Sequence, residues 1–278
     1  SVPLKEENVE RLDEYMRAFN QPVSRVSLEQ GEYANTGFTQ WGASGLAAAW
    51  AEENTRESIF NAFRRKETFA TTGTRIAVRF FGGYNLSSID LNSESLVSEA
   101  YQKGVTMGSD LLHNENKIPE FLVWAQRGKN GAPLQRIQII KGWIDNNSGR
   151  PKEKVFDVAC SDGMQPDPIT NRCPDNGARV NINDCSITTN VGSSELKTVW
   201  KDPEFAPDDK TFYYVRVLEN PTCRWSTWDA IKAGYKPREG LHETIQERAW
   251  SSPIWYIPEQ SDVEVVPLGG TIQLRNID

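Results

Sequence analysis

Short segments of alternating apolar and polar residues, separated by turn-forming residues, make up most of the chain after residue 75. Such alternation places apolar side chains on one face of a strand, and many short strands in series favour an antiparallel sandwich over a parallel sheet with crossover helices. The segments predicted as strands are residues 75–81, 120–127, 134–144, 153–160, 180–189, 194–200, 211–219, 246–257 and 263–275. The sequence therefore predicts a mainly β fold, an antiparallel β-sandwich of about eight strands.

Segments near both ends of the chain predict helices. Residues 5–19 predict an amphipathic helix, because Val9, Leu12, Met16 and Phe19 fall on one of its faces. That helix needs a partner to cover the apolar stripe. Residues 21–40 are polar and are predicted to form a connector. Residues 226–233 predict another helix, with a serine or threonine as its cap.

A further helix is predicted to begin after Asn54, which suits an N-cap, with Glu57 placed to complete a reciprocal capping pair. Ile59, Phe60 and Phe63 fall on one side of this helix, and that side is predicted to be buried. Basic residues follow at its C-terminal end, where they suit the negative end of the helix dipole.

The composition is that of a folded globular protein, with 38% hydrophobic and 25% charged residues. The formal net charge of -7 disfavours contact with a phosphate backbone, and no long basic stripe is present. Nucleic acid is therefore not expected as a partner. No run of about 18 apolar residues occurs, so no membrane span is expected.

All four cysteines lie in the second half of the chain, which favours disulfides and an exported, periplasmic or secreted location. Cys160 and Cys173 enclose a loop of Asp, Pro, Asn and Gly residues that a bridge would hold in place. This pairing leaves Cys185 and Cys223 to join two strand ends. Reduced thiols in a cytosolic protein are the alternative, and a thiolate metal site is disfavoured because no CxxC pair occurs.

The chain has only two histidines, His113 and His242, and they are far apart in the sequence. A zinc site would need ligands scattered along the chain, so each is predicted to be an ordinary surface or hydrogen-bonded side chain. No GxSxG motif, Walker loop or dinucleotide fingerprint occurs. Serine hydrolase, nucleotide-binding and hydride-transfer functions therefore have no support in the sequence.

Three groups of polar residues are candidates for ligand binding. Glu52 and Glu53 form a carboxylate pair that suits acid–base work or substrate binding, or else complements the N-terminus of the following helix. Arg75 carries a planar fork that suits phosphate or sulfate, or else a structural ion pair. The loop after Cys160 is rich in oxygen ligands, so it could hold a calcium ion or be a disulfide-stapled polar loop. Its candidate ligands are Asp162, Asp167, Asn171, Asp175 and Asn176.

Tryptophan is abundant, with nine in 278 residues. Exposed indole rings stack on sugar rings, whereas buried ones fill a core. Trp124, Trp143, Trp200 and Trp255 lie inside predicted strands, and they are therefore predicted to belong to the core of the sandwich.

Four segments carry a family resemblance, namely AWAEENTRESIFNAFRRKETFATTGTRIAVRFFGG, FLVWAQRGKNGAPLQRIQIIKGWID, FYYVRVLENPTCRWSTWDAIKAG and ERAWSSPIWY. They resemble the C-terminal part of a bacterial family of unknown function that is related to the PHP (polymerase and histidinol phosphatase) metal-dependent hydrolases. The resemblance extends from Trp41 to Tyr256. It implies a distorted α/β barrel that holds metal ions, followed by a β-sandwich, in proteins that are exported in many cases.

This resemblance divides the chain in two. It implies that residues 1–74 are C-terminal elements of the barrel with a connector, in which residues 41–72 supply the closing strand and helix, and that residues 75–278 form the sandwich. The metal-ligand motifs of the family, HxH, an Asp-His pair and Asp-Thr-His, do not occur here. The chain is therefore expected to be the C-terminal portion of a longer polypeptide. Its partner would be the N-terminal barrel segment of the same protein, which holds the divalent metal.

The first functional hypothesis is thus an exported PHP-like hydrolase of phosphoesters or related esters, in which this chain supplies no chemistry and is inactive alone. The alternative is a free-standing β-sandwich that binds a carbohydrate or a protein partner, and a third hypothesis is a structural domain without a ligand. The apolar face between Trp41 and Phe63 discriminates between the first two. A bare face predicts a missing partner segment, and a covered face predicts an independent module.

Overall fold

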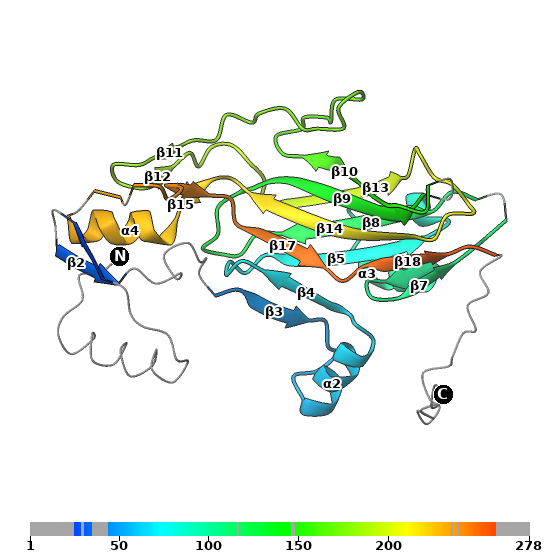
Figure 1. Cartoon of the computed structure of the whole chain (residues 1–278). Coiled ribbons are helices and arrows are strands. Elements are labelled where there is room, and N and C mark those ends of the chain that lie inside the picture. The colour runs from blue at the N-terminus through cyan, green and yellow to red at the C-terminus, as the bar shows by residue number, and fades with distance from the viewer. Residues whose placement is uncertain are drawn as a thin grey trace, which may run out of the picture.

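The computed structural model describes residues 44–259, apart from residues 116, 146, 147, 235 and 238, together with the backbone of residues 25–28 and 31–34. Within these limits the chain is mainly β, as predicted, and two sheets pack face to face as a sandwich (Figure 1). The helix predicted for residues 5–19 and the strand predicted for residues 263–275 lie outside the described residues.

The larger sheet has eight strands, and all but one of its strand pairs are antiparallel. In spatial order its main path is β10 (Pro151–Cys160), β9 (Leu134–Ile144), β14 (Thr211–Glu219), β17 (Arg248–Ser251), β4 (Thr68–Thr71) and β3 (Leu46–Ala49). Off this path, β18 (Ile254–Ile257) pairs with β14, and β7 (Asp110–Leu112) runs parallel to β18. The predicted strand at 246–257 is thus two strands separated by Ser252 and Pro253, because proline cannot donate to a ladder.

The smaller sheet has four antiparallel strands. Their order is β13 (Glu195–Lys201), β8 (Glu120–Gln126), β5 (Ala77–Gly83) and β6 (Gly104–Thr106). Three of these strands agree with the prediction to within a few residues. The fourth, β6, belongs to a stretch without any predicted structure.

The core of the sandwich lies between the two sheets, because the predicted alternation holds on both. Ile137 and Ile139 of β9 and Val215 of β14 point inward and are fully buried. Tyr213 meets Phe121 from the opposite sheet, with ring centroids 4.3 Å apart. Full burial of a side chain of this size contributes roughly 1.5 to 3 kcal/mol, so contacts of this kind hold the two sheets together.

The outer face of the smaller sheet is covered by a turn and a helix that the sequence patterns did not predict. These are the short 3-10 helix η2 (Leu86–Ser88) and α3 (Leu96–Lys103). Leu86, Leu96 and Ala100 pack on Phe81 and Leu122 in a second apolar cluster. The sequence signal is weak because α3 has only eight residues and contacts the sheet through few of them.

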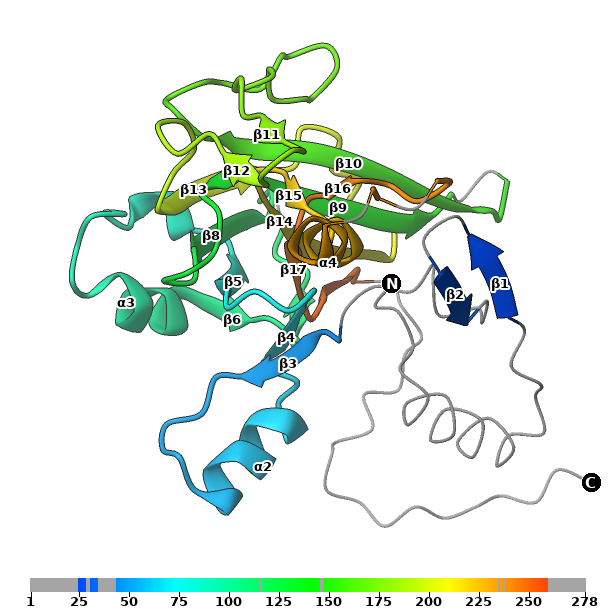
Figure 2. The ribbon, with the colours of Figure 1, turned by 90° about the vertical axis from the view of Figure 1, so that its left-hand side faces the viewer.

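Helix α2 (Arg56–Arg64) is present, but two details of its prediction are wrong. Its N-cap is Thr55, one residue after Asn54, and the Thr55 hydroxyl accepts a hydrogen bond from the amide of Ser58. Phe60 and Phe63 are 59% and 53% exposed, so the side predicted to be buried faces solvent. Figure 2 shows the reason: α2 stands away from the sandwich, at the end of the extension formed by β3 and β4.

The strand predicted to help close a barrel belongs to the larger sheet of the sandwich. β3 pairs antiparallel with β4, and β4 pairs antiparallel with β17 of the larger sheet. The predicted domain boundary between residues 74 and 75 would therefore separate β3 and β4 from the other strands of the larger sheet, although β4 is hydrogen-bonded to β17.

Small elements close one end of the sandwich. β11 (Val180–Asn181) and β12 (Ser186–Ile187) form a hairpin in place of the continuous strand predicted for 180–189, and Cys185 in its turn has a φ of 57°. β15 (Thr222–Cys223) pairs with β16 (Thr244–Ile245) beside α4 (Trp225–Ala233). The N-cap of α4 is Arg224, which makes no side-chain capping bond, so the predicted serine or threonine cap is wrong.

Two remaining predictions are corrected in part. β1 (Arg25–Leu28) and β2 (Gly31–Ala34) pair as a hairpin inside the segment predicted as a connector. Of the tryptophans predicted to belong to the core, Trp200 packs against it, whereas Trp255 is 45% exposed. Trp124 packs on the second apolar cluster instead, and Trp143 lies in β9 beside Lys141 and is only partly buried.

Both predicted disulfides are confirmed. Cys160 is bonded to Cys173 and Cys185 to Cys223, with sequence separations of 13 and 38. The first holds the loop after β10 against the larger sheet, and the second ties the β11–β12 hairpin to β15 beside α4. No free cysteine remains among the described residues.

We predict that the Cys160→Ala/Cys173→Ala variant loses about 2 to 3 kcal/mol of unfolding free energy, because the unfolded chain regains the freedom of the loop. The matched variant Cys185→Ala/Cys223→Ala releases a longer loop and should lose about 1 kcal/mol more. Urea unfolding followed by tryptophan fluorescence measures both. Equal stability of the first variant and the wild-type protein would show that the other contacts of this loop suffice to hold it.

Candidate functional site

A cleft lined by four arginines lies at the end of the sandwich beside α4. Its volume is about 520 Å³, and we call it the arginine cleft. The residues that line it are Gln135, Arg136, Asp175, Ala178, Arg179, Pro221, Arg224, His242, Thr244, Ile245, Gln246 and Arg248. This concentration of positive charge stands out on a chain whose formal net charge is -7.

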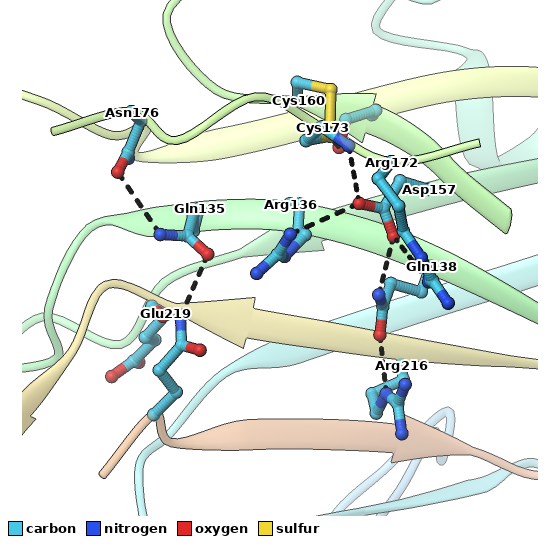
Figure 3. Close-up of polar contacts among 12 residues, drawn as sticks. Gln135, Arg136, Gln138, Asp157, Cys160, Arg172, Cys173, Asn176, Arg216 and Glu219 are labelled. Carbon is cyan, nitrogen blue, oxygen red and sulfur yellow. Dashed lines mark hydrogen bonds and ion pairs between the residues drawn. A yellow bond between two sulfur atoms is a disulfide. The ribbon is translucent and has the colours of Figure 1, made fainter. Parts of the chain in front are cut away.

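Strand β9 supplies Arg136, because the alternation that turns Ile137 into the core turns its neighbour outward. The guanidinium Nη1 of Arg136 lies 3.3 Å from the Asp157 carboxylate of β10 (Figure 3). Its Nε is buried and has no hydrogen-bond partner in the described part of the chain. Arg136 is thus held in place on one side and keeps a donor available.

Asp157 holds this side of the cleft together. Its carboxylate is buried and accepts hydrogen bonds from Gln138 Nε2 at 2.6 Å and from the amide of Cys173 at 2.7 Å. Arg172 approaches the same carboxylate at 3.5 Å. The Gln138 amide oxygen in turn accepts from Arg216 Nε at 2.6 Å. Strands β10, β9 and β14 and the disulfide loop are therefore joined through one buried charge, as Figure 3 shows.

Two glutamines on neighbouring segments tie the cleft together further. Gln135 donates from Nε2 to the side-chain oxygen of Asn176 at 3.2 Å. Gln246 donates from its own Nε2 to the Gln135 side-chain oxygen at 2.9 Å and approaches the Glu219 carbonyl at 3.1 Å. The loop after β10, the start of β9 and the segment before β17 are thus linked by side-chain amides.

The other three arginines approach from separate elements. Arg224, at the N-terminus of α4, is buried and donates to the Ser226 hydroxyl at 2.6 Å. Arg248 of β17 donates from Nε to the Gln246 carbonyl at 3.1 Å. Arg179 forms an ion pair with Asp175 at 2.7 Å, which lowers the pKa of Asp175 to about 2, and the charge of Arg136 acts in the same direction. The guanidinium groups outnumber the carboxylates, so the cleft favours an anion.

A second cleft, of about 430 Å³, lies on the other side of the segment before β17, and we call it the α4 cleft. Gln246 and Arg248 line the arginine cleft, whereas Glu247 between them lines the α4 cleft. This is the alternation of an extended chain. Glu219 lines the α4 cleft as well, together with Trp225 and Trp228 from α4.

The Glu219 side chain is fully buried and accepts one hydrogen bond, from the amide of Ala132 at 3.2 Å. Burial raises the pKa of Glu219 to about 7, and the neighbouring charge of Glu247 acts in the same direction. The nearby Thr74 hydroxyl acts to lower the pKa of Glu219. The two side chains nevertheless do not meet the geometry of a hydrogen bond. A Cβ at Gly131 would lie 2.5 Å from the Glu219 carboxylate, so a larger residue there would displace this side chain.

The two clefts share one further property. Among the described residues, four buried side-chain atoms lack a hydrogen-bond partner, namely Thr74 Oγ1, Arg136 Nε, Glu219 Oε1 and Glu247 Oε2. All four residues line one of the two clefts. Leaving a buried polar group unpaired costs about 1 to 3 kcal/mol, so such groups are uncommon and call for a reason. A bound ligand that pairs with them would supply one.

A third cleft contains Glu52, one of the residues predicted to bind substrate. It is lined by Trp50, Arg65, Glu67, Arg79 and Tyr101 among others, and its volume is about 590 Å³. Its polar groups already pair with one another. Buried Glu67 accepts hydrogen bonds from the Tyr101 and Thr106 hydroxyls, and the Arg79 guanidinium lies 3.7 Å from the centre of the Trp50 ring. The hydrogen bonds of Glu67 join the turn before β4 to α3 and β6, and the cluster leaves little unused for a ligand.

The other residues predicted to bind ligands do not gather. Glu53 and Arg75 are exposed, and neither lines the cleft of Glu52. In the loop after Cys160, Asp162 accepts from the Gly192 amide, and Asp167 accepts from the amide and hydroxyl of Thr170.

Two further members of the calcium set are also engaged elsewhere. Asp175 forms an ion pair with Arg179. The backbone N–H of Asn171 donates to the Asp167 carbonyl, and the backbone carbonyl of Asn171 accepts from the Asp157 amide. Among the described residues no group of three or more His, Cys, Asp and Glu side chains is placed to hold a metal ion. The disulfide that closes this loop is present, and the calcium site stays a prediction.

The histidines behave as predicted. His113 Nδ1 lies 2.7 Å from the Tyr256 hydroxyl, so this histidine is hydrogen-bonded. His242 is exposed at the edge of the arginine cleft. Neither belongs to a group of three or more His, Cys, Asp and Glu side chains in the part of the chain that the structure describes.

We predict that Glu219→Gln makes the protein more stable relative to wild type as the pH rises. Glu219 has a folded pKa of about 7 against an ordinary value of 4.5. The folded wild-type protein therefore retains this proton where the unfolded chain releases it, and wild-type stability falls across this interval by about 3 kcal/mol. Urea unfolding at several pH values from 4.5 to above 7 measures this difference. The exposed Glu94→Gln is the control, and parallel pH profiles for wild type and Glu219→Gln would contradict the assignment.

Comparison with known proteins places the chain in a family but gives it no function. A model for a protein of unknown function, DUF3604, matches residues 9–258. No curated protein matches the chain, and no solved structure matches it either. Because the matched range covers most of the sequence, the chain belongs to the DUF3604 family of proteins of unknown function.

Proposed function

We propose that this chain is the substrate-binding part of an exported hydrolase, and that the arginine cleft holds the anionic group of an ester of phosphate, sulfate or a related acid. One observation carries the proposal: four guanidinium groups line a single cleft, and the buried Nε of Arg136 has no partner among the described residues. Guanidinium groups bind such oxyanions through paired hydrogen bonds, which favours them over lysine at these sites.

The size and rigidity of the arginine cleft suit a small ligand. Its volume of about 520 Å³ lies within the range of small-molecule sites. Arg136 is held by buried Asp157, which is itself fixed by the loop that Cys160 and Cys173 close. A cationic group held in advance in this way loses little freedom when a ligand binds, which favours affinity.

Two disulfides support an exported location, because such bonds persist in oxidising compartments. A periplasmic or secreted location is our proposal on this basis. Within the described residues, no helix combines the length and apolar character that crossing a membrane requires.

We assign the chemical step to the barrel that the resemblance to PHP-related hydrolases implies, and not to the described part of this chain. The described residues hold no cluster of three or more metal-ligating side chains, so they do not fit the divalent metal that the resemblance implies. We therefore propose that a barrel segment of the same protein supplies the metal and the hydrolysis, and that this chain binds the substrate beside it.

A protein partner is supported by a second observation. Leu46, Phe60 and Phe63 are 43%, 59% and 53% exposed, so the described part of the β3–β4–α2 extension carries exposed apolar side chains on both β3 and α2. Exposed apolar side chains in this region favour a missing partner segment over an independent module. The extension is therefore our candidate for contact with the barrel.

We predict that inorganic phosphate or sulfate binds in the arginine cleft, and that Arg248→Gln and Arg179→Gln each weaken this binding roughly 10-fold or more, because each removes a charged hydrogen-bond donor. Isothermal titration calorimetry at low ionic strength measures the affinity. The matched control is Arg150→Gln, which removes one positive charge from an exposed position outside the cleft.

The control separates a site from a general charge effect. Equal weakening by Arg150→Gln and by the two cleft variants would assign the binding to net charge alone. Absence of phosphate and sulfate binding in the wild-type protein would contradict the proposal.

We also predict that the purified chain does not hydrolyse bis(p-nitrophenyl) phosphate, with or without added manganese, zinc or magnesium. The reason is that its described residues offer no metal centre. Release of p-nitrophenolate, followed by absorbance, checks this. Metal-dependent turnover by this chain alone would contradict the assignment of the chemistry to another segment.

A further inference from the structure

The α4 cleft is a second site that the proposed function does not use. It shares no lining residue with the arginine cleft, although the two lie on opposite sides of the segment before β17. Its character is also different, because aromatic rings and carboxyl groups take the place of guanidinium groups. A ligand for this cleft must satisfy both kinds of group.

Helix α4 presents the aromatic wall. Trp225 and Trp228 are three residues apart on the helix, which places them on the same face, and they are 36% and 40% exposed. Both line the α4 cleft. The Arg224 guanidinium lies 4.9 Å from the centre of the Trp225 ring, and Lys232 Nζ lies 5.5 Å from the centre of the Trp228 ring. The opposite face of each exposed ring is the surface offered to a ligand that has a flat apolar face of its own.

The same cleft is lined by two carboxyl groups, each with an oxygen that has no hydrogen-bond partner among the described residues. Glu219 is fully buried, and its Oε1 has no hydrogen-bond partner in the described part of the chain. The same holds for Oε2 of Glu247, whose carbonyl accepts the Glu219 amide at 2.9 Å and so fixes the two residues side by side. Each oxygen can accept a hydrogen bond from a ligand hydroxyl, and a carboxyl that retains its proton can also donate one.

Anions, metal ions and purely apolar ligands fit this cleft poorly. An anion is disfavoured by the two carboxyl groups. A metal ion is disfavoured because no third acidic, histidine or cysteine ligand joins them among the described residues. A purely apolar ligand would leave Glu219 and Glu247 unpaired at a cost of about 1 to 3 kcal/mol each. A sugar ring has a C–H face for an indole and hydroxyls at its edge for the carboxyl groups.

We propose that the α4 cleft binds a neutral saccharide, with a sugar ring stacked on Trp228 and its hydroxyls hydrogen-bonded to Glu219 and Glu247. This site does not depend on the arginine cleft. The Cys185–Cys223 disulfide lines the same cleft and holds the β11–β12 hairpin against it. The saccharide pairs with the buried oxygens that the protein leaves unpaired.

The test is a titration of the wild-type chain with glucose, galactose, mannose and N-acetylglucosamine, each as the monosaccharide and as a disaccharide. Isothermal titration calorimetry and quenching of tryptophan fluorescence detect binding. We expect at least one of these sugars to bind, and we expect Trp228→Ala and Glu247→Gln each to weaken that binding at least tenfold. Trp255→Ala is the matched control, since Trp255 is 45% exposed and lies outside the cleft.

The outcomes distinguish this proposal from the proposed function. Trp228→Ala should lose saccharide binding and retain phosphate binding, because Trp228 is not part of the arginine cleft. If Trp228→Ala does not fold, as judged by circular dichroism, Glu247→Gln alone decides, because it conserves the size of the side chain. No binding of any tested sugar, or equal affinity in wild type and the variant that folds, overturns the proposal.

Discussion

The buried carboxylate of Asp157 is the charge on which the outer face of the larger sheet depends. Removing a carboxylate from water is costly unless donors surround it. Here the donors come from β9, from the Cys173 amide and from two arginines, with the Gln138 contact at 2.6 Å. Because these donors lie on different segments, satisfying one carboxylate fixes the position of a strand, a loop and a guanidinium group together.

The Cys160–Cys173 bond and this carboxylate support each other. The bond restricts the loop to conformations in which the Cys173 amide can reach Asp157, and the hydrogen bond at 2.7 Å then holds the loop on the sheet. The outer face of β9 and β10 is thereby covered by polar chain and not by a helix. Arg136 lies beside this loop and lines the arginine cleft.

The two clefts owe their opposite character to the alternation of one short segment. Gln246, Glu247 and Arg248 are consecutive, and successive side chains of an extended chain point to opposite sides. Arg248 therefore joins the cationic cleft while Glu247 joins the carboxyl groups of the α4 cleft. Four buried polar atoms without hydrogen-bond partners among the described residues belong to residues that line these clefts. Leaving such atoms unpaired costs free energy, and a ligand that forms hydrogen bonds with them would remove this cost.

Much of the sandwich could be predicted from the sequence, and the candidate sites could not. Strand β14 carries a strong period-two pattern of burial, and the cysteine spacing indicated both disulfides. Helix α3 was missed because eight residues with a partial apolar face give little signal. Phe60 and Phe63 were misjudged because an apolar helix face indicates a need for burial and does not indicate whether a partner is present. The arginines of the cleft come from four separate segments, and none belongs to a motif.

The sequence by itself determined the mainly β fold class and predicted the disulfide pairs, because these follow from local periodicity and spacing. Only the tertiary structure decided which polar residues meet. Arg136 and Arg248 are more than one hundred residues apart, and Glu219 and Glu247 come from different segments, yet each pair lines one cleft. The physical reason is that charges interact through distance in space and through burial, and both depend on how strands far apart in the chain pair and pack.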